Sequence, residues 1–192
     1  NINLENSFWH KQIETIINSD EKYGESTTFQ GKNINVEFVS ANPTGPLHVG
    51  HVRGAVIGDV LSNILKKVGF NVTKEYYIND AGNQIDLFVQ SVYSKYSTLI
   101  GEEYPMPDNG YMGDYIEEIA IEIHNENITK KLNEEAIKPI ALEKMLSNIQ
   151  ADLSNLNVEF DNWFSEKSLF TSGEFNDTMN KFERDQQSFK EN

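Results

Sequence analysis

Apolar and polar residues alternate along parts of the chain, and this alternation predicts the strands. In residues 34–39 every second side chain is apolar, which is the two-residue period of a strand with one buried face. Residues 72–78 are rich in β-branched and aromatic side chains and are predicted to form a second strand. Residues 157–166 are predicted to form a third strand and a sheet edge.

Apolar side chains spaced three to four residues apart predict the helices. The predicted helical segments are 7–18, 47–68, 84–100, a stretch around 116–123, a helix that opens at Pro139, and a last helix after a capping box at 171–174. The final ten residues are polar and are expected to be frayed. The strand, helix and strand within 34–78 form a βαβ unit, which implies parallel strands and an α/β fold.

Two glycines lie inside the helix predicted at 47–68. Gly54 and Gly58 are four residues apart, and each costs stability in a helix interior. We therefore expect both to allow close packing of the helix on the sheet. The neighbouring Asp59 is given no catalytic role.

A turn rich in proline and glycine, residues 40–46, separates the first strand from the first long helix. Pro46 suits the first helical position, so the helix is expected to open near Leu47. His48 and His51 follow on one face, where the unpaired N–H groups and the dipole of a helix N-terminus attract phosphate. Imidazoles at this place can donate hydrogen bonds to a phosphate that gains charge. Gly50 between them lets a base or ribose approach the backbone.

A second polar turn, residues 79–84, follows the second predicted strand. Parallel strands end at the same edge of a sheet, so both turns are expected to face one crevice, where α/β sheets bind ligands. Asn42 and the second turn would bring together amides and the Asp80 carboxylate, which suit a guanidinium with five donors and no acceptor. Alternatives to ligand binding stay open for both turns. The residues of the second turn would then only cap their own backbone, and the two histidines would be surface groups or two ligands of a metal.

Composition narrows the classes of function. The 192 residues can bury one substantial core. A formal net charge of −14, and the absence of Lys and Arg from residues 97–128, argue against a broad nucleic-acid surface. The chain has no cysteine, which excludes disulfides and fits a reducing compartment. No apolar run approaches the ~20 residues of a membrane span and no signal pattern is visible, so we expect a cytoplasmic protein without a membrane partner.

Residues 41–53, Ala-Asn-Pro-Thr-Gly-Pro-Leu-His-Val-Gly-His-Val-Arg, resemble the ATP-binding signature of class I aminoacyl-tRNA synthetases, in the form used by bacterial arginyl-tRNA synthetases. Residues 58–61, 75–84 and 111–115 are similar to further segments of that family. The resemblance implies a Rossmann-like parallel sheet, the N-terminal half of the class I nucleotide-binding fold, with an acidic, mainly helical insertion. The implied parts are a linker helix and loop (1–32), the first half of the catalytic domain (33–100), the insertion (101–154), and a return strand with a C-terminal helix (155–192).

The same resemblance implies the reaction and its residues. ATP and arginine would form arginyl-adenylate and pyrophosphate, and arginine would then pass to tRNA(Arg). His48 and His51 would be catalytic, and ATP would be bound by Pro43, Thr44, Gly45, Leu47, His48, Gly50 and His51. Arginine would be bound by Asn42, Tyr76, Asp80 and Gln84. Mg²⁺ is implied by ATP only, no metal ligands are assigned, and a monomer is expected.

Several parts of the family have no counterpart in the chain: a second, lysine-rich ATP signature, the second half of the nucleotide fold, and the anticodon-binding and N-terminal domains. Residues 144–147, Lys-Met-Leu-Ser, lie inside a predicted helix and lack the second lysine, so they are not taken as that signature. The polypeptide is therefore expected to be a fragment that does not aminoacylate tRNA alone, with most tRNA contacts elsewhere. Two other functions stay open: a small nucleotidyltransferase of the pantetheine-phosphate or cytidylyl type, and a non-catalytic module that binds arginine or its adenylate.

Overall fold

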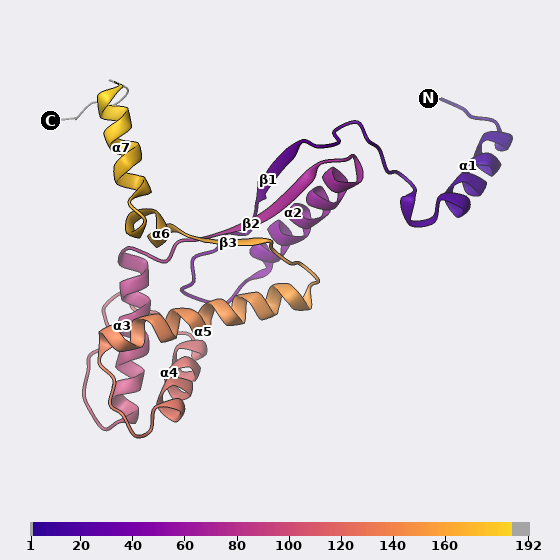
Figure 1. Cartoon of the computed structure of the whole chain (residues 1–192). Helices are drawn as coiled ribbons and strands as arrows, with labels where there is room; N and C mark the ends of the chain where they lie inside the picture. Colours follow the sequence, from indigo (N-terminus) through magenta and orange to yellow (C-terminus); the bar gives the residue numbers. More distant parts are fainter. Residues whose placement is uncertain (1, 186–192) are drawn as a thin grey trace.

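The computed structural model describes residues 2–185 and shows a small parallel sheet with helices packed against it (Figure 1). In chain order the elements are α1 (Asn6–Ser19), the 3₁₀ turn η1 (Asp20–Lys22), β1 (Asn33–Glu37), α2 (Val49–Lys67), β2 (Asn71–Ile78), α3 (Asn83–Leu99), α4 (Asp114–Glu126), α5 (Glu134–Asn155), β3 (Asn162–Ser165), α6 (Glu166–Thr171) and α7 (Glu174–Arg184). The predicted α/β fold class is confirmed.

The three strands lie in the order β1-β2-β3, and both neighbouring pairs are parallel. Asn33 is paired with Asn71 at the start of β1, and Tyr76 is paired with Trp163 between β2 and β3. Since α2 connects β1 to β2, the predicted βαβ unit is confirmed. The carboxyl ends of parallel strands share one edge, so the turns after β1 and β2 lie at the same end of the sheet.

Helix α2 packs closely on the sheet because Gly58 has no side chain. A Cβ atom on Gly58 would lie 2.2 Å from Cγ of Phe38, so the expected packing role of this glycine is confirmed. The same expectation is wrong for Gly54, where an added Cβ would have no neighbour within 4 Å. Gly54 lies one helical turn away from the contact with Phe38, and it faces open space.

An ion pair also joins α2 to β2. Nζ of Lys74 lies 2.5 Å from Oδ1 of Asp59, and the two side chains are only 11% and 17% exposed. Asn63 donates to the other oxygen of Asp59 (2.9 Å). The backbone N–H of Lys74 donates to Asp161 (2.8 Å), which holds the chain entering β3 beside β2. Asp59 therefore acts in packing the helix on the sheet.

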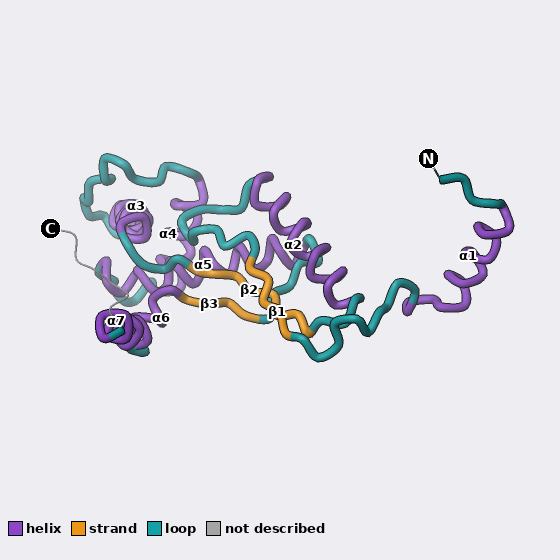
Figure 2. Tube along the Cα trace, turned by 90° about the horizontal axis from the view of Figure 1, so that it is seen from above, coloured by secondary structure: helices purple, strands orange, loops and turns teal. Residues whose placement is uncertain are grey.

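Helices α3, α4 and α5 pack against one another and bury most of the apolar core. Figure 2 shows this group beside the sheet, at the end opposite α1. The largest fully buried side chains of the group include Phe88, Tyr96, Ile119, Met145 and Ile149. The hydroxyl of Tyr96 accepts a hydrogen bond from the backbone of the loop before α5 (3.1 Å), so its burial leaves no unpaired polar group.

Helix α1 lies apart from the sheet and from the other helices (Figure 1). The predicted helix is confirmed, and none of its residues is buried. Trp9, Ile13 and Ile17 are 53%, 54% and 69% exposed. Its apolar stripe therefore has no partner within residues 2–185.

Helix α5 begins at Glu134, so the prediction of a helix that opens at Pro139 is wrong. Oδ1 of Asn133 caps the helix by accepting a backbone hydrogen bond from its first turn (3.0 Å). A proline inside a helix costs about 3 kcal/mol. The cap and the full burial of Ile137 and Ala141, on either side of the proline, outweigh that cost.

Near the C-terminus the predicted third strand is confirmed but is shorter than predicted, and the predicted capping box is wrong. Strand β3 covers only Asn162–Ser165, which are the residues that pair with β2, and Asn157 at the start of the predicted segment has a left-handed backbone (φ 57°) instead of an extended one. The capping box at 171–174 does not form, since residues up to Thr171 belong to α6. Helix α7 is preceded instead by Gly173 (φ 85°), with no side-chain cap.

Residues 2–185 contain no helix with the length and apolar character that crossing a bilayer requires. The frayed end was expected for the last ten residues, and seven of these, 186–192, lie outside the described part of the chain.

Candidate functional site

A sharp turn directs the chain from β1 across the carboxyl edge of the sheet. Val39 (φ 65°) and Ser40 (φ 43°) both adopt the left-handed conformation, which is strained for a β-branched residue. The backbone N–H of Ser40 donates to the carbonyl of Phe38 (2.9 Å) and closes a three-residue turn. Oγ of Ser40 accepts from the backbone N–H of Tyr77 (3.1 Å), which holds the turn against β2. Backbone strain of this kind clusters at functional sites.

His48 and His51 form a reciprocal cap at the start of α2. His48 precedes the first helical residue, Val49, so the predicted opening near Leu47 is wrong by two residues. Nδ1 of His48 accepts from the N–H of Gly50 (3.1 Å), and Nδ1 of His51 accepts from the N–H of His48 (3.3 Å). The two rings stack with their centroids 3.8 Å apart. Imidazoles thus fill a role that Ser, Thr, Asp and Asn usually have.

These hydrogen bonds determine which ring nitrogen carries the proton. A neutral imidazole has one donor and one acceptor nitrogen, so acceptance at Nδ1 leaves the proton on Nε2 of each ring. Burial, and secondly the charge of His48, lower the pKa of His51, which favours its neutral form. Each ring then has an Nε2–H donor close to a helix N-terminus, where the dipole favours an anion.

Gly50 is needed for this cap. A Cβ atom at Gly50 would lie 2.9 Å from Cε1 and 3.1 Å from Nδ1 of His48. The sequence suggested that Gly50 allows a ligand to approach the backbone, and the structure shows that the ring of His48 occupies space beside it.

A pocket of about 240 Å³ lies between the two turns at the carboxyl edge of the sheet. It is lined by Asn42, Asn79, Ala81, Gly82, Asn83, Gln84 and Ile85. Nδ2 of Asn42 donates to Oε1 of Gln84 (2.6 Å), so the structure brings these two predicted arginine contacts together. The volume is below the roughly 300–1,000 Å³ of sites for drug-sized ligands, and it suits part of an amino acid better than a nucleotide.

Asp80, a third predicted arginine contact, does not line this pocket. Its carboxylate accepts from Oγ of Ser165 (2.5 Å) and from the backbone N–H of Lys167 (2.9 Å). Asp80 therefore joins the end of β2 to the start of α6.

Tyr76, the fourth predicted arginine contact, is fully buried in the core. Its ring stacks on Trp163 with centroids 4.4 Å apart, and its hydroxyl donates to the carbonyl of Ala41 (2.9 Å). Burial raises the pKa of Tyr76 to about 12, so the hydroxyl remains a donor. In this structure Tyr76 supports the first turn from inside the core and does not face the pocket.

Two carboxylates that the sequence reasoning missed, Glu37 and Glu166, lie near Tyr77 together with Asp80, on the sheet face turned away from α2. Burial raises the pKa of Tyr77, and the charges of Glu166, Asp80 and Glu37 raise it further. With its amide oriented to donate, Asn79 contacts Oε2 of Glu166 (2.7 Å). Glu37 could have been found as the last residue of the first strand. Glu166 could not, because its place depends on the pairing of β3 with β2.

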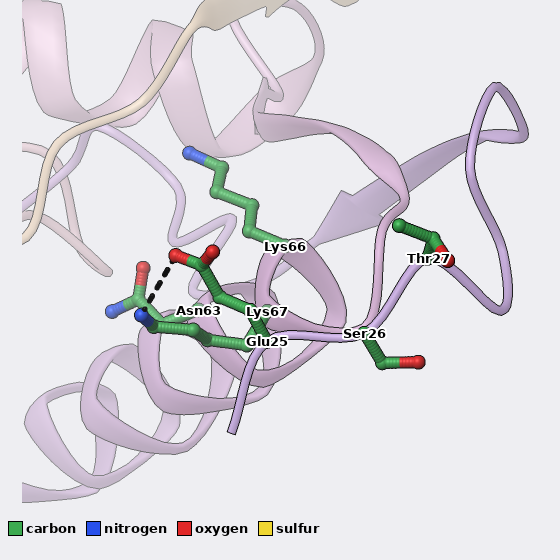
Figure 3. Close-up of a pocket in the computed structure, with 6 residues that line it drawn as sticks. All are labelled: Glu25, Ser26, Thr27, Asn63, Lys66 and Lys67. Carbon is green, nitrogen blue, oxygen red and sulfur yellow. Dashed lines mark hydrogen bonds and ion pairs between the residues drawn. The ribbon is translucent and has the colours of Figure 1, made fainter. Parts of the chain in front are cut away.

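A second cavity (Figure 3), of about 780 Å³, lies at the C-terminal end of α2, whereas the histidines lie at the N-terminal end of this helix. It is lined by Glu25, Ser26, Thr27, Asn63, Lys66 and Lys67. Nζ of Lys67 contacts Glu25 (3.3 Å) and the carbonyl of Glu21, and the carbonyl of Lys67 accepts from the N–H of Ser26 (2.8 Å). These contacts hold the loop before β1 against α2, so we assign the cavity a structural role.

Within residues 2–185, no three His, Asp or Glu side chains come together as ligands for a metal ion. Lys144, in the segment compared above with a lysine-rich signature, pairs with Glu122 (3.1 Å) and Glu126 (2.7 Å) and so joins α5 to α4.

These features define an α/β protein whose parallel sheet carries a strained turn, a capped helix N-terminus and a polar pocket at its carboxyl edge, where such sheets bind ligands. Residues 12–190 match the family model described as tRNA synthetases class I (R), catalytic domain. The chain belongs to this family.

Relatives of known name agree with this assignment. The chain is 43% identical to arginine–tRNA ligase 1 of Halalkalibacterium halodurans, over 94% of the chain and 34% of that relative. It is 46% identical to arginine–tRNA ligase of Rhizobium rhizogenes, over 90% of the chain and 31% of that relative. The chain thus spans about a third of the length of the curated relatives it matches.

Solved structures show the same fold. A provisionally assigned arginyl-tRNA synthetase from Campylobacter jejuni is similar with a TM-score of 0.81 and 31% identity, over 98% of this chain and 42% of that chain. The arginyl-tRNA synthetase of Thermus thermophilus has a TM-score of 0.55 and 20% identity, over 89% of this chain and 30% of that chain. The second likeness concerns the fold alone.

Proposed function

We propose that this chain is part of an arginine–tRNA ligase and supplies a site where ATP and arginine combine. The observation that carries the proposal is the course of the turn at 40–46. Its Asn42 lines the pocket with Gln84, and the turn then leads directly into the cap formed by His48 and His51. One short segment would therefore hold an amino acid at one end and a phosphate at the other, close enough to react.

In the proposed reaction the arginine carboxylate attacks the α-phosphate of ATP, arginyl-adenylate forms and pyrophosphate leaves. Arginine then passes to the 3′ end of tRNA(Arg). The substrate supplies the nucleophile, so no side chain has to form a covalent bond. The Nε2–H groups of His48 and His51 would stabilise the phosphate as its negative charge increases. The remaining residues proposed to contact ATP are Pro43, Thr44, Gly45, Leu47 and Gly50.

The positive groups of arginine require acceptors. Amide oxygens of Asn42 and Gln84 would supply them in the pocket, and Glu166, which contacts Asn79 of the pocket lining, would add negative charge nearby. Asp80 contributes charge but is already hydrogen-bonded at both oxygens.

The other partners follow from the proposed activity. Mg²⁺ would enter with the phosphates of ATP, which usually complete its coordination. The charge of −14 makes broad contact of this chain with RNA unfavourable, so we propose that tRNA(Arg) is bound mainly by other parts of the protein, in the cytoplasm. The boundaries of the Rossmann-like part (33–100) and the insertion (101–154) stay predictions.

Calorimetric titration of the chain with arginine, lysine, ATP and a non-hydrolysable arginyl-adenylate analogue tests the proposal. We expect preference for arginine over lysine, and analogue binding that is roughly tenfold weaker in His48→Ala and in His51→Ala. His10→Ala, on the separate helix α1, is the matched control and should bind as the unmodified chain does.

The remaining outcomes separate the alternatives. ATP binding without preference for arginine over lysine would favour a nucleotidyltransferase, and arginine binding without nucleotide binding would favour a non-catalytic module. The family assignment and the named relatives favour neither of these.

A further inference from the structure

Tyr115, near the start of α4, contacts the turn that leads into the histidine cap. Its hydroxyl donates to the backbone carbonyl of Thr44 at 2.8 Å, although the two residues are 71 positions apart. Burial raises the pKa of Tyr115, so this hydroxyl remains protonated and a donor near neutral pH. The contact joins the helical group α3–α5 to the turn at the edge of the sheet.

Two glycines provide the space that Tyr115 occupies. A Cβ atom on Gly113 would lie 2.4 Å from Cε1 of the ring, and one on Gly45 would lie 3.2 Å from the hydroxyl oxygen. Gly113 has φ −71°, a conformation open to any residue. Space, and not backbone freedom, therefore accounts for glycine at this position.

The hydroxyl of Tyr115 is the counterpart of the hydroxyl of Tyr76. Tyr76 donates to the carbonyl of Ala41 (2.9 Å) from the sheet, and Tyr115 donates to the carbonyl of Thr44 (2.8 Å) from the helical group. Together they hold the turn on both sides of Asn42 and Pro43. A carbonyl held in this way fixes the orientation of its whole peptide plane, here the one that joins Thr44 to Gly45.

We propose that Tyr115 is a positioning residue for nucleotide binding, which acts by fixing the Thr44–Gly45 peptide beside the histidine cap. The inference rests on the proposed function of that turn. Through Tyr115 the helical group α3–α5 would contribute to the site, because a movement of α4 would also move the turn.

The test compares Tyr115→Phe with Tyr104→Phe. Both changes remove one phenolic hydroxyl, and Tyr104 donates to Glu134 (3.0 Å) within the helical group, away from the turn. In Tyr115→Phe we expect faster hydrogen exchange at the amides of Thr44 and Gly45, and roughly fivefold weaker binding of the adenylate analogue, the equivalent of one hydrogen bond of ~1 kcal/mol. Tyr104→Phe should leave both unchanged.

A compensating pair tests the contact itself. In Gly45→Ala the new Cβ meets the hydroxyl oxygen of Tyr115 at 3.2 Å, whereas without that oxygen the nearest atom is Cζ, at an ordinary 3.5 Å. Gly45→Ala should therefore lower Tm in the unmodified chain by more than it does in the Tyr115→Phe background. An equal loss in both backgrounds would overturn the assigned contact.

The outcomes distinguish this inference from the proposed function. Exchange and affinity that match those of Tyr104→Phe would overturn the role of Tyr115. Faster exchange with unchanged affinity for the adenylate analogue would show that Tyr115 fixes the turn but that nucleotide binding does not depend on it. This result would also overturn the proposal. If the unmodified chain does not bind the analogue, the proposed function is wrong, and so is the role of Tyr115 in nucleotide binding. Hydrogen exchange and the Gly45→Ala comparison would still decide whether Tyr115 holds the turn.

Discussion

Gly58 lies so close to Phe38 that an added Cβ would be 2.2 Å from Cγ of the ring, well inside van der Waals contact. Gly58→Ala is therefore expected to lower the free energy of unfolding by about 2 kcal/mol, because overpacking exceeds the gain in helix propensity. Urea denaturation measures the change.

Gly54→Ala is the matched control for this prediction. It makes the same substitution one turn away, where nothing lies within 4 Å, so it should raise the free energy of unfolding by up to about 1 kcal/mol. Equal effects of the two glycine substitutions would refute the close contact.

The ion pair between Asp59 and Lys74 gives a second prediction. Both side chains are largely buried, so Lys74→Met would leave the Asp59 carboxylate without its cation and cost about 3 kcal/mol in urea denaturation. Replacing both residues, in Asp59→Leu with Lys74→Met, should recover most of the loss, since a well-packed apolar pair can replace a buried ion pair. A double variant as unstable as Lys74→Met would contradict this account.

The parts of the fold with local causes could be predicted from the sequence. The βαβ unit follows from apolar periods within single segments, and the meeting of Asn42 with Gln84 follows from the rule that parallel strands end at one edge. The burial of Tyr76 could also have been found, because alternation along β2 places it on the same face as Ile78. Its assignment as an arginine contact came from the family resemblance and did not use that alternation.

Other features of the site have no local signal. The hydrogen bond from Tyr115 to Thr44 depends on how the helical group docks on the sheet, and a single hydroxyl adds no period to the sequence. The histidine cap was missed because His is not among the residues that usually cap helices, so Pro46 was taken as the start. At Pro139, burial of the flanking residues outweighed a reliable local rule.

Gly50 gives a prediction that separates stability from binding. In Gly50→Ala the new Cβ would displace the ring of His48, which removes a cap worth about 1 kcal/mol while helix propensity rises by a similar amount. Stability should therefore change little, but affinity for the adenylate analogue should fall roughly tenfold because one donor is misplaced. Calorimetry and thermal unfolding of the same samples measure both quantities. Gly54→Ala is the control, and equally tight binding by the two variants would show that the orientation of His48 is not required.

The lowered pKa of His51 predicts how stability depends on pH. Burial, and then the charge of His48, hold this pKa below the ordinary 6.5, so below about pH 6.5 the unfolded chain binds more protons at this position than the folded chain does. The contribution of His51 to the free energy of unfolding is therefore lost as the pH falls through the window beneath 6.5, and it is constant above that window.

Urea denaturation at a series of pH values measures this effect. The free energy of unfolding should decrease less with acid in His51→Gln than in the unmodified chain. His10→Gln is the control for removing one histidine from an acidic protein. In His48→Gln the pKa of His51, followed by NMR, should rise but stay below 6.5, because burial is the larger cause. An equal decrease in His51→Gln and the unmodified chain would contradict the assignment of a partly buried, neutral His51 at the helix start.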